Sequence, residues 1–182
     1  MKHQLFGLLC LLVALNSCNW STEPQYSPQI SRSAFFVNPV FSGDSLVGWK
    51  DTLSLSYDSQ DSSWDMDTVY LGDTVMFASS YYTVNSDLVS VKMEWNHQEM
   101  NLWYKLTQDI EKVLVNDSTT QTGHLYFAPG YNHVSFPIYF TPIQKGGMTL
   151  QLTVESTSEF PTNSVLIYIP VKEQVADSVA VN

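Results

Sequence analysis

Apolar and polar residues alternate along several stretches of this chain, and that period of two constrains its fold more than any other feature. Residues 149–155 alternate without a fault, which places Leu150, Leu152 and Val154 on one face of an extended strand. The same alternation recurs in residues 52–57, 73–78, 89–95, 123–128, 133–140 and 164–171. We therefore predict a chain organised as strands, each with one apolar face to bury.

Turn-forming residues such as Gly72, Gly130 and Gly146 separate these stretches. About seven short strands with this spacing favour an all-β fold, an antiparallel two-sheet sandwich of the Ig-like kind. We predict that residues from every part of the pattern meet in its core, namely Phe77, Val91, Trp95, Phe127, Phe136, Leu152 and Ile167.

Two stretches depart from a plain strand pattern. Pro137 interrupts residues 133–140, and a proline cannot donate a backbone hydrogen bond, which indicates an edge strand or a bulge there. Leu102, Leu106 and Ile110 follow a helical spacing, so one short helix near residues 102–115 is a second option for that region.

The N-terminus carries the pattern of an export signal. Lys2 precedes an apolar run over residues 5–15, which suits a signal peptide and is too short for a membrane-spanning helix. The run ends in Leu15-Asn16-Ser17-Cys18, which resembles the lipobox of bacterial lipoproteins. This resemblance implies that residues 1–17 are a signal peptide and that Cys18 is the lipidated first residue of the mature protein.

Cysteine usage agrees with a lipid anchor, because Cys18 is the only cysteine outside residues 1–17. A single exported cysteine cannot form an internal disulfide, and lipidation explains why it is there. Two or more acyl chains on one residue give stable membrane anchoring. We therefore expect a protein held by lipid on the outer membrane of a Gram-negative cell. The sequence does not distinguish the periplasmic face of that membrane from the cell surface.

Composition divides the rest of the chain. Residues 18–34 are polar and contain prolines, which suits an extended tether, residues 35–172 are expected to form one β-sandwich domain, and residues 173–182 a tail. The formal charge is −10, from 8 Lys and Arg against 18 Asp and Glu. Nucleic-acid binders concentrate Lys and Arg, so we do not expect nucleic acid as a partner.

The sequence offers no arrangement typical of catalysis. Gly43-Asp44-Ser45-Leu46 matches the tetrapeptide of the GDSL esterases, but the Asp-x-x-His that this family also needs is missing. Without a base, Ser45 stays a weak nucleophile. We therefore expect a protein that is not an enzyme and that has no cofactor.

Metal binding is not the favoured interpretation either. The histidines of the mature chain are too scattered to resemble a zinc site. The acidic stretch from Asp58 to Asp73 offers oxygen ligands for Ca²⁺, but it lacks the glycine and the terminal glutamate of a calcium loop. A solvated loop between two strands is favoured there, with Ca²⁺ left open.

Two aromatic residues in predicted loops are candidates for ligand contact. Trp64 lies in the polar segment 58–67, and Tyr131 lies in the turn 129–132. Exposed aromatic rings give contact area at a small entropic cost, which suits recognition more than chemistry. A tryptophan in such a loop can also fold back onto the core.

A further pattern is Asp followed by Ser or Thr and then by an aliphatic residue or Thr. It occurs six times, more often than composition would produce, and resembles the O-glycosylation signal of exported Bacteroides proteins. Strand architecture offers an equally good explanation, because Asp often ends a turn and Thr-Val often begins a strand. The hydroxyl residues of the pattern are Ser45, Thr52, Thr68, Thr74, Ser118 and Ser178.

With its lipobox, tether and Ser- and Thr-rich strands, the chain resembles small lipoproteins of gut Bacteroidetes that carry one Ig-like β-sandwich. Residues 123–161 are most similar to them. Most members of such groups have no assigned activity, so the resemblance implies an envelope location and a fold.

For function we expect a non-catalytic surface module that binds a glycan or an envelope partner through loops at one end of the sandwich. The alternative is a structural or assembly subunit that offers a strand edge, such as the one bearing Pro137, to a partner strand.

Overall fold

A computed structural model describes residues 26–106, 113–117 and 122–174. Within these residues the chain forms strands, turns and irregular segments, and no helix. This part of the chain accordingly contains no helix long and apolar enough to cross a membrane. Residues 1–25 with Cys18, and also Ser118 and Ser178, lie outside the described residues.

The strands form two main sheets and one separate hairpin. The first sheet has the order β11-β14-β9-β2-β5, with β1 also paired to β9. Its strands are β1 Gln29–Arg32, β2 Phe35–Val37, β5 Asp51–Leu53, β9 Val75–Tyr82, β11 Met100–Tyr104 and β14 His133–Pro142. The hairpin consists of β3 Val40–Ser42 and β4 Ser45–Gly48.

The second sheet has the order β12-β13-β10-β15-β16-β7-β6, with β8 also paired to β16. Its strands are β6 Leu55–Asp58, β7 Ser63–Met66, β8 Val69–Tyr70, β10 Leu88–Trp95, β12 Val113–Asp117, β13 Thr122–Phe127, β15 Gly146–Ser156 and β16 Thr162–Lys172. Neighbouring strands are antiparallel except where β16 meets β7 and β8.

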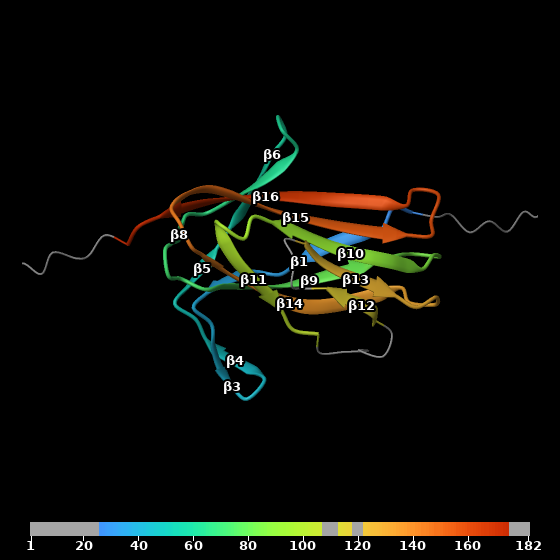
Figure 1. The fold of residues 1–182 in the computed structure, drawn as a ribbon, viewed down its shortest axis with the longest axis horizontal. Helices are drawn as coiled ribbons and strands as arrows, with labels where there is room; N and C mark the ends of the chain where they lie inside the picture. Colours follow the sequence, from blue (N-terminus) through green and yellow to red (C-terminus); the bar gives the residue numbers. More distant parts are fainter. Residues whose placement is uncertain (1–25, 107–112, 118–121, 175–182) are drawn as a thin grey trace, which may run out of the picture.

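The two sheets stack into a sandwich, with the hairpin of β3 and β4 projecting from the side of the first sheet (Figure 1). All seven predicted core residues are buried, with exposed fractions of 6% or less. The period-two pattern works because alternate side chains of each strand face the opposite sheet. The predicted all-β antiparallel sandwich is therefore confirmed.

The predicted strand over residues 52–57 is divided between the two sheets. Ser54 separates β5, in the first sheet, from β6, in the second. Asp67 holds this crossing in place: its Oδ2 accepts a hydrogen bond from the Ser54 amide at 2.8 Å, and its own amide donates to the Ser54 carbonyl at 3.1 Å.

The alternative of a helix near residues 102–115 is wrong for the described part of that range. Residues 100–104 form β11 and residues 113–117 form β12, while residues 107–112 lie outside the described residues. Met100 and Leu102 are buried whereas Asn101 and Trp103 are exposed, so the period of two prevails over the helical spacing.

The predicted edge or bulge at Pro137 is also wrong, because β14 lies between β11 and β9 and its pairing with β9 continues through Pro137 without a register shift. The Pro137 carbonyl accepts a hydrogen bond from the Lys105 amide at 3.2 Å, just past the end of β11. The Pro137 nitrogen faces that same side, where the β11 ladder has ended. The proline cannot return a hydrogen bond to Lys105, and β11 ends at this point, so β14 accommodates Pro137 between two strands.

The sheet also begins earlier than the expected domain start at residue 35. β1, which lies inside the segment predicted as a tether, pairs with residues 79–82 of β9.

Candidate functional site

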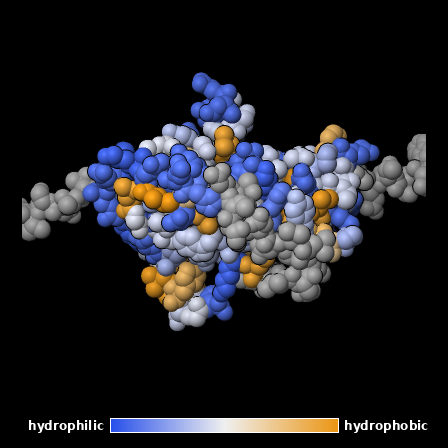
Figure 2. Space-filling model, in the orientation of Figure 1, coloured by the Kyte–Doolittle hydropathy of each residue, from blue (hydrophilic) through white to orange (hydrophobic). Residues whose placement is uncertain are grey.

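The hairpin of β3 and β4 is built around a tight turn. Ser42 and Ser45 pair at its tip, and Gly43 between them has a φ of 60°. A glycine with positive φ at the first central position is typical of the two-residue type II′ turn, whose twist suits a hairpin. The Gly-Asp-Ser-Leu tetrapeptide therefore forms the tip of this hairpin. Apolar surface gathers on the hairpin (Figure 2), where Val40, Phe41 and Val47 are exposed.

Polar contacts fix the base of the hairpin. Asn38 has a φ of 48°, in the left-handed region that asparagine tolerates better than most residues. Its Nδ2 donates to Asp73 Oδ1 at 2.8 Å, and its Oδ1 accepts from the Thr74 amide at 2.8 Å. Asp73 is buried and also pairs with Lys50 Nζ at 3.0 Å. The chain therefore leaves β2 in one defined direction.

The tip of the hairpin is fixed by a residue that follows β11. Lys105, which follows β11, places its Nζ 2.8 Å from Asp44 Oδ1. This hydrogen bond and the opposite charge lower the pKa of Asp44 and raise the pKa of Lys105, so both are charged at neutral pH. Between the two anchors, the Phe41 ring lies 6.4 Å from the Tyr139 ring.

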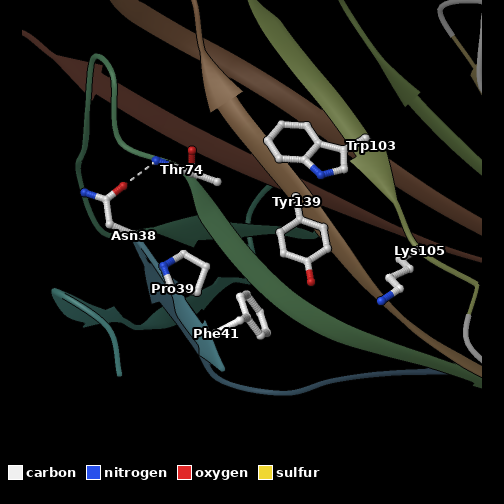
Figure 3. Close-up of a pocket in the computed structure, with 7 residues that line it drawn as sticks. All are labelled: Asn38, Pro39, Phe41, Thr74, Trp103, Lys105 and Tyr139. Carbon is white, nitrogen blue, oxygen red and sulfur yellow. Dashed lines mark hydrogen bonds between the residues drawn. The ribbon is translucent and has the colours of Figure 1, made fainter. Parts of the chain in front are cut away.

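A cleft of about 650 Å³ lies between the hairpin and the outer face of the first sheet. Figure 3 shows the residues that line it, which are Asn38, Pro39, Phe41, Thr74, Trp103, Lys105 and Tyr139. A second hollow of about 350 Å³ shares Phe41, Lys105 and Tyr139 with it. We call the first of these the aromatic cleft.

Two parallel rings dominate the aromatic cleft. Trp103 and Tyr139 are directly opposite each other on β11 and β14. Their ring centroids are 5.5 Å apart, their planes differ by 6°, and Trp103 stays 43% exposed. Such a cross-strand aromatic pair stabilises its own geometry, so the rings present one pre-arranged apolar surface.

Polar groups surround this surface without giving it a net charge. Among the described residues, Lys105 is the one charged side chain that lines the aromatic cleft, and Asp44 neutralises it. Burial raises the pKa of Tyr139, and the charge of Lys105 partly opposes this rise. The Tyr139 hydroxyl is therefore protonated at neutral pH. Thr74 adds a hydroxyl, bonded to Thr141 at 3.0 Å. The arrangement suits a neutral ligand with one apolar face and several hydrogen-bonding groups.

The two predicted ligand contacts do not line the aromatic cleft. The expectation that Tyr131 is presented in an exposed loop is wrong: it is 4% exposed, and its ring packs 5.0 Å from Phe127. Trp64 belongs to β7, in a hairpin with β6, and is partly buried. Its ring contacts Tyr57 at 5.1 Å and Arg32 at 4.7 Å.

Two acidic residues of the 58–73 segment stabilise its first turn. Asp58 accepts a hydrogen bond from the Gln60 amide, and Asp61 accepts one from the Ser63 hydroxyl. Within the described residues, no three His, Cys, Asp or Glu side chains come together in a way that could hold a metal ion.

The predicted O-glycosylation residues within the described part of the chain differ in exposure. Ser45 and Thr52 are exposed, whereas Thr68 and Thr74 are partly buried. Their modification, like that of Ser118 and Ser178 outside the described residues, stays a prediction.

No family model matches the chain, and no curated protein matches it. Among solved structures it is similar to BslA, a bacterial hydrophobin, at 11% identity over 85% of this chain and 100% of that one, with a TM-score of 0.41. It is also similar to AggA, the major subunit of aggregative adherence fimbriae type I from Escherichia coli, at 13% identity over 66% and 93% of the chains, with a TM-score of 0.33.

A further similar structure is the PapD-like domain 7 of human CEP192, at 14% identity over 75% of this chain and 100% of that one, with a TM-score of 0.32. At these identities and scores no function is transferred from any of the three. The resemblance to Bacteroidetes lipoproteins accordingly stays a prediction.

Proposed function

We propose that this protein is a non-catalytic binding module of the cell envelope that recognises a neutral glycan in the aromatic cleft. The observation that carries the proposal is the parallel pair of Trp103 and Tyr139, held 5.5 Å apart beside polar groups whose one charge, on Lys105, is paired with Asp44. A pyranose ring has an apolar face of C–H groups and a rim of hydroxyls. The aromatic surface matches that face, and Thr74 and Tyr139 can bond the rim.

The cleft suits binding more than chemistry. General acid–base catalysis of glycoside cleavage uses two carboxyl groups on either side of the bond. Asp44 belongs to the adjoining hollow, and no second carboxylate lines either space in the described part of the chain. Asp44 also has its pKa lowered by Lys105, which makes it a poor proton donor at neutral pH.

A glycan array with the purified mature protein tests this proposal. We expect wild type to bind at least one neutral oligosaccharide and Trp103→Ala to lose that signal, because the larger half of the aromatic surface is gone. Trp49→Ala is the matched control: Trp49 is also exposed, packs 4.7 Å from Phe36 and does not line the cleft. Equal binding by wild type and Trp103→Ala would contradict the proposal.

The proposed location is the outer membrane, through lipid on Cys18. Support comes from the apolar run that ends in Leu-Asn-Ser-Cys and from the lack of any other cysteine outside residues 1–17. Detergent phase partitioning of cell extracts tests it. Wild type should enter the detergent phase and Cys18→Ala should not; a variant that stays there would rule out the lipid anchor.

An assembly role through a strand edge is the second candidate. β11 pairs with β14 on one side, and no strand of the described residues pairs with its other side. Such an edge can accept a strand from a partner. An absence of glycan binding, together with one envelope protein that co-purifies with wild type, would favour this role over glycan recognition.

A further inference from the structure

A second cleft, of about 350 Å³, opens between the edges of the two sheets. The first sheet contributes residues of β1, β2 and β5, and the second contributes residues of β6 and β7. Arg32 and Ser33 are its polar lining residues, and the others are apolar, namely Ala34, Phe35, Leu53, Leu55 and Trp64. We call it the Arg32 cleft. It contains Trp64, which the sequence singled out, and shares no lining residue with the aromatic cleft.

Arg32 occupies an inward-facing position of β1. It pairs in register with Ser79 of β9, and Ser79 is fully buried inside the sandwich. The guanidinium carbon lies 4.7 Å from the centre of the Trp64 ring, which is a cation–π contact. The charge therefore lies at the border of the core.

The Arg32 guanidinium lacks an anionic partner. Its Nη1 is buried without a hydrogen bond, and no carboxylate of the described residues forms an ion pair with it. Burial lowers the pKa of Arg32, but an arginine stays charged in a protein. A partly buried guanidinium usually has a carboxylate or phosphate to accept its hydrogen bonds, and here that acceptor is missing.

Two buried hydroxyls lie beside Arg32 on the inner face of the first sheet. Ser79 and Tyr81 are fully buried and lie two residues apart on β9, so their side chains share one face of the strand. Burial raises the pKa of Tyr81, and a hydrogen bond with Ser79 and the charge of Arg32 partly oppose that rise. Ser79 and Tyr81 can each donate and accept, but neither hydroxyl bonds Nη1 of Arg32, which stays without an acceptor.

We propose that the Arg32 cleft binds a carboxylate carried on a hydrocarbon chain, as in a medium-chain fatty acid. The guanidinium of Arg32 receives the carboxylate, and Phe35, Leu53 and Leu55 contact the chain. Both halves of the ligand are needed, because the cleft joins one unpaired cation to an apolar lining. The proposal is independent of glycan recognition in the aromatic cleft.

The competing interpretation is that Arg32 only protects an edge. β1 pairs with β9 alone among the described strands, and an inward-pointing charge is one way to discourage edge-to-edge association. In that case Arg32 would have no ligand, and its removal would promote oligomers without changing the affinity for any carboxylate. Binding measurements separate the two interpretations.

Isothermal titration calorimetry of the mature protein with octanoate is the test, with octanol and acetate as comparison ligands. We expect saturable, one-site binding of octanoate and at least about tenfold weaker binding of both comparison ligands, because each lacks one half of the required chemistry. Arg32→Met should lose about tenfold or more in octanoate affinity and should bind octanoate and octanol alike.

Controls make each outcome decisive. Lys145→Met removes an exposed cation paired with Glu173 and should leave octanoate affinity unchanged. Should Arg32→Met fold poorly, Arg32→Lys keeps the charge, loses the planar fork and should still weaken octanoate several-fold. An absence of octanoate binding, equal affinity in Arg32→Met, or equal loss in Lys145→Met would overturn the proposal. Loss of octanoate binding in Trp103→Ala would also overturn the proposal. Loss of glycan binding alone in that variant would leave the proposal intact.

Discussion

The two faces of β14 carry aromatic residues in different settings. Facing the second sheet, Phe136 and Phe140 are at most 1% exposed, and Phe136 packs 5.6 Å from Tyr81. Facing outward from the same strand, Tyr139 packs 5.5 Å from Trp103, which stays 43% exposed. The ring separations are nearly equal, but water is excluded from only one of the two pairs.

This difference separates stability from recognition. Removing a ring from the inner face leaves a cavity that the close-packed interior cannot fill. Removing a ring from the outer face exposes little new surface and leaves the sheet intact, but it destroys a pre-arranged contact area. The inner face should therefore determine whether the chain folds, and the outer face what it binds.

The largest expected effect is on the inner face. Phe136→Ala should lower the free energy of unfolding by about 3–5 kcal/mol, because a fully buried ring is replaced by a cavity. Chemical denaturation followed by circular dichroism measures it. Tyr139→Ala, three residues further along the same strand, should lower the free energy of unfolding by about 1 kcal/mol or less. Similar losses in both variants would remove the distinction between the faces.

An intermediate effect is expected at the base of the hairpin. Asn38→Ala should lower the free energy of unfolding by about 2 kcal/mol, because it deletes hydrogen bonds to Asp73 and Thr74 and puts alanine at a positive φ. Asn38→Gly keeps the backbone conformation and should lose less. Thermal unfolding of the two variants separates these causes, and an Asn38→Gly as unstable as Asn38→Ala would show that the backbone conformation is unimportant.

The smallest expected effect is on glycan affinity, through the ion pair at the tip of the hairpin. The pKa of Asp44 is lowered by its ion pair with Lys105. The ion pair therefore stabilises the hairpin tip fully at pH values above the ordinary pKa of 3.8, and this stabilisation is lost as the pH falls through the lowered pKa. The pKa of Lys105 is raised, so the stabilisation by the ion pair is still present at pH 10.5, the ordinary pKa of lysine, and is lost only at higher pH.

Glycan affinity should accordingly be flat between about pH 5 and pH 9 and should weaken slightly on strong acidification. Asp44→Asn should have the slightly weakened affinity at neutral pH and no further loss in acid, as measured by binding titrations at each pH. A steep pH dependence near neutrality would show that a different group controls the cleft.

The core could be predicted from sequence because its signal is local. Val91, Leu152 and Ile167 each belong to a run whose alternate residues are apolar, and alternate residues of a strand necessarily share a face. The same rule fails at a sheet crossing: Ser54 interrupts a run with an unbroken pattern, and only the contact with Asp67 reveals where the chain changes sheet.

The aromatic cleft could not be predicted because its parts are distant in sequence. Trp103 stands beside Tyr139 only through the pairing of β11 with β14, and Asp44 meets Lys105 only through the placement of the hairpin. One local signal did exist, since Trp103 alternates with buried Leu102, but the helical spacing of neighbouring leucines obscured it.

Tyr131 shows the opposite error. The turn signal at Pro129 and Gly130 predicted exposure, but the Tyr131 carbonyl accepts the Leu88 amide at 2.6 Å, and the ring closes over Phe127. A turn signal locates a change of chain direction. It does not determine on which side of the chain the next side chain lies.

The central claim is that ligand binds on the rings of Trp103 and Tyr139, and tryptophan indole N–H resonances of ¹⁵N-labelled protein test it most directly. During titration with the oligosaccharide identified on the array, we predict that the Trp103 indole signal shifts saturably. The signals of buried Trp95 and of Trp64 in the Arg32 cleft should stay in place. A Trp64 shift with an unchanged Trp103 signal would contradict the account.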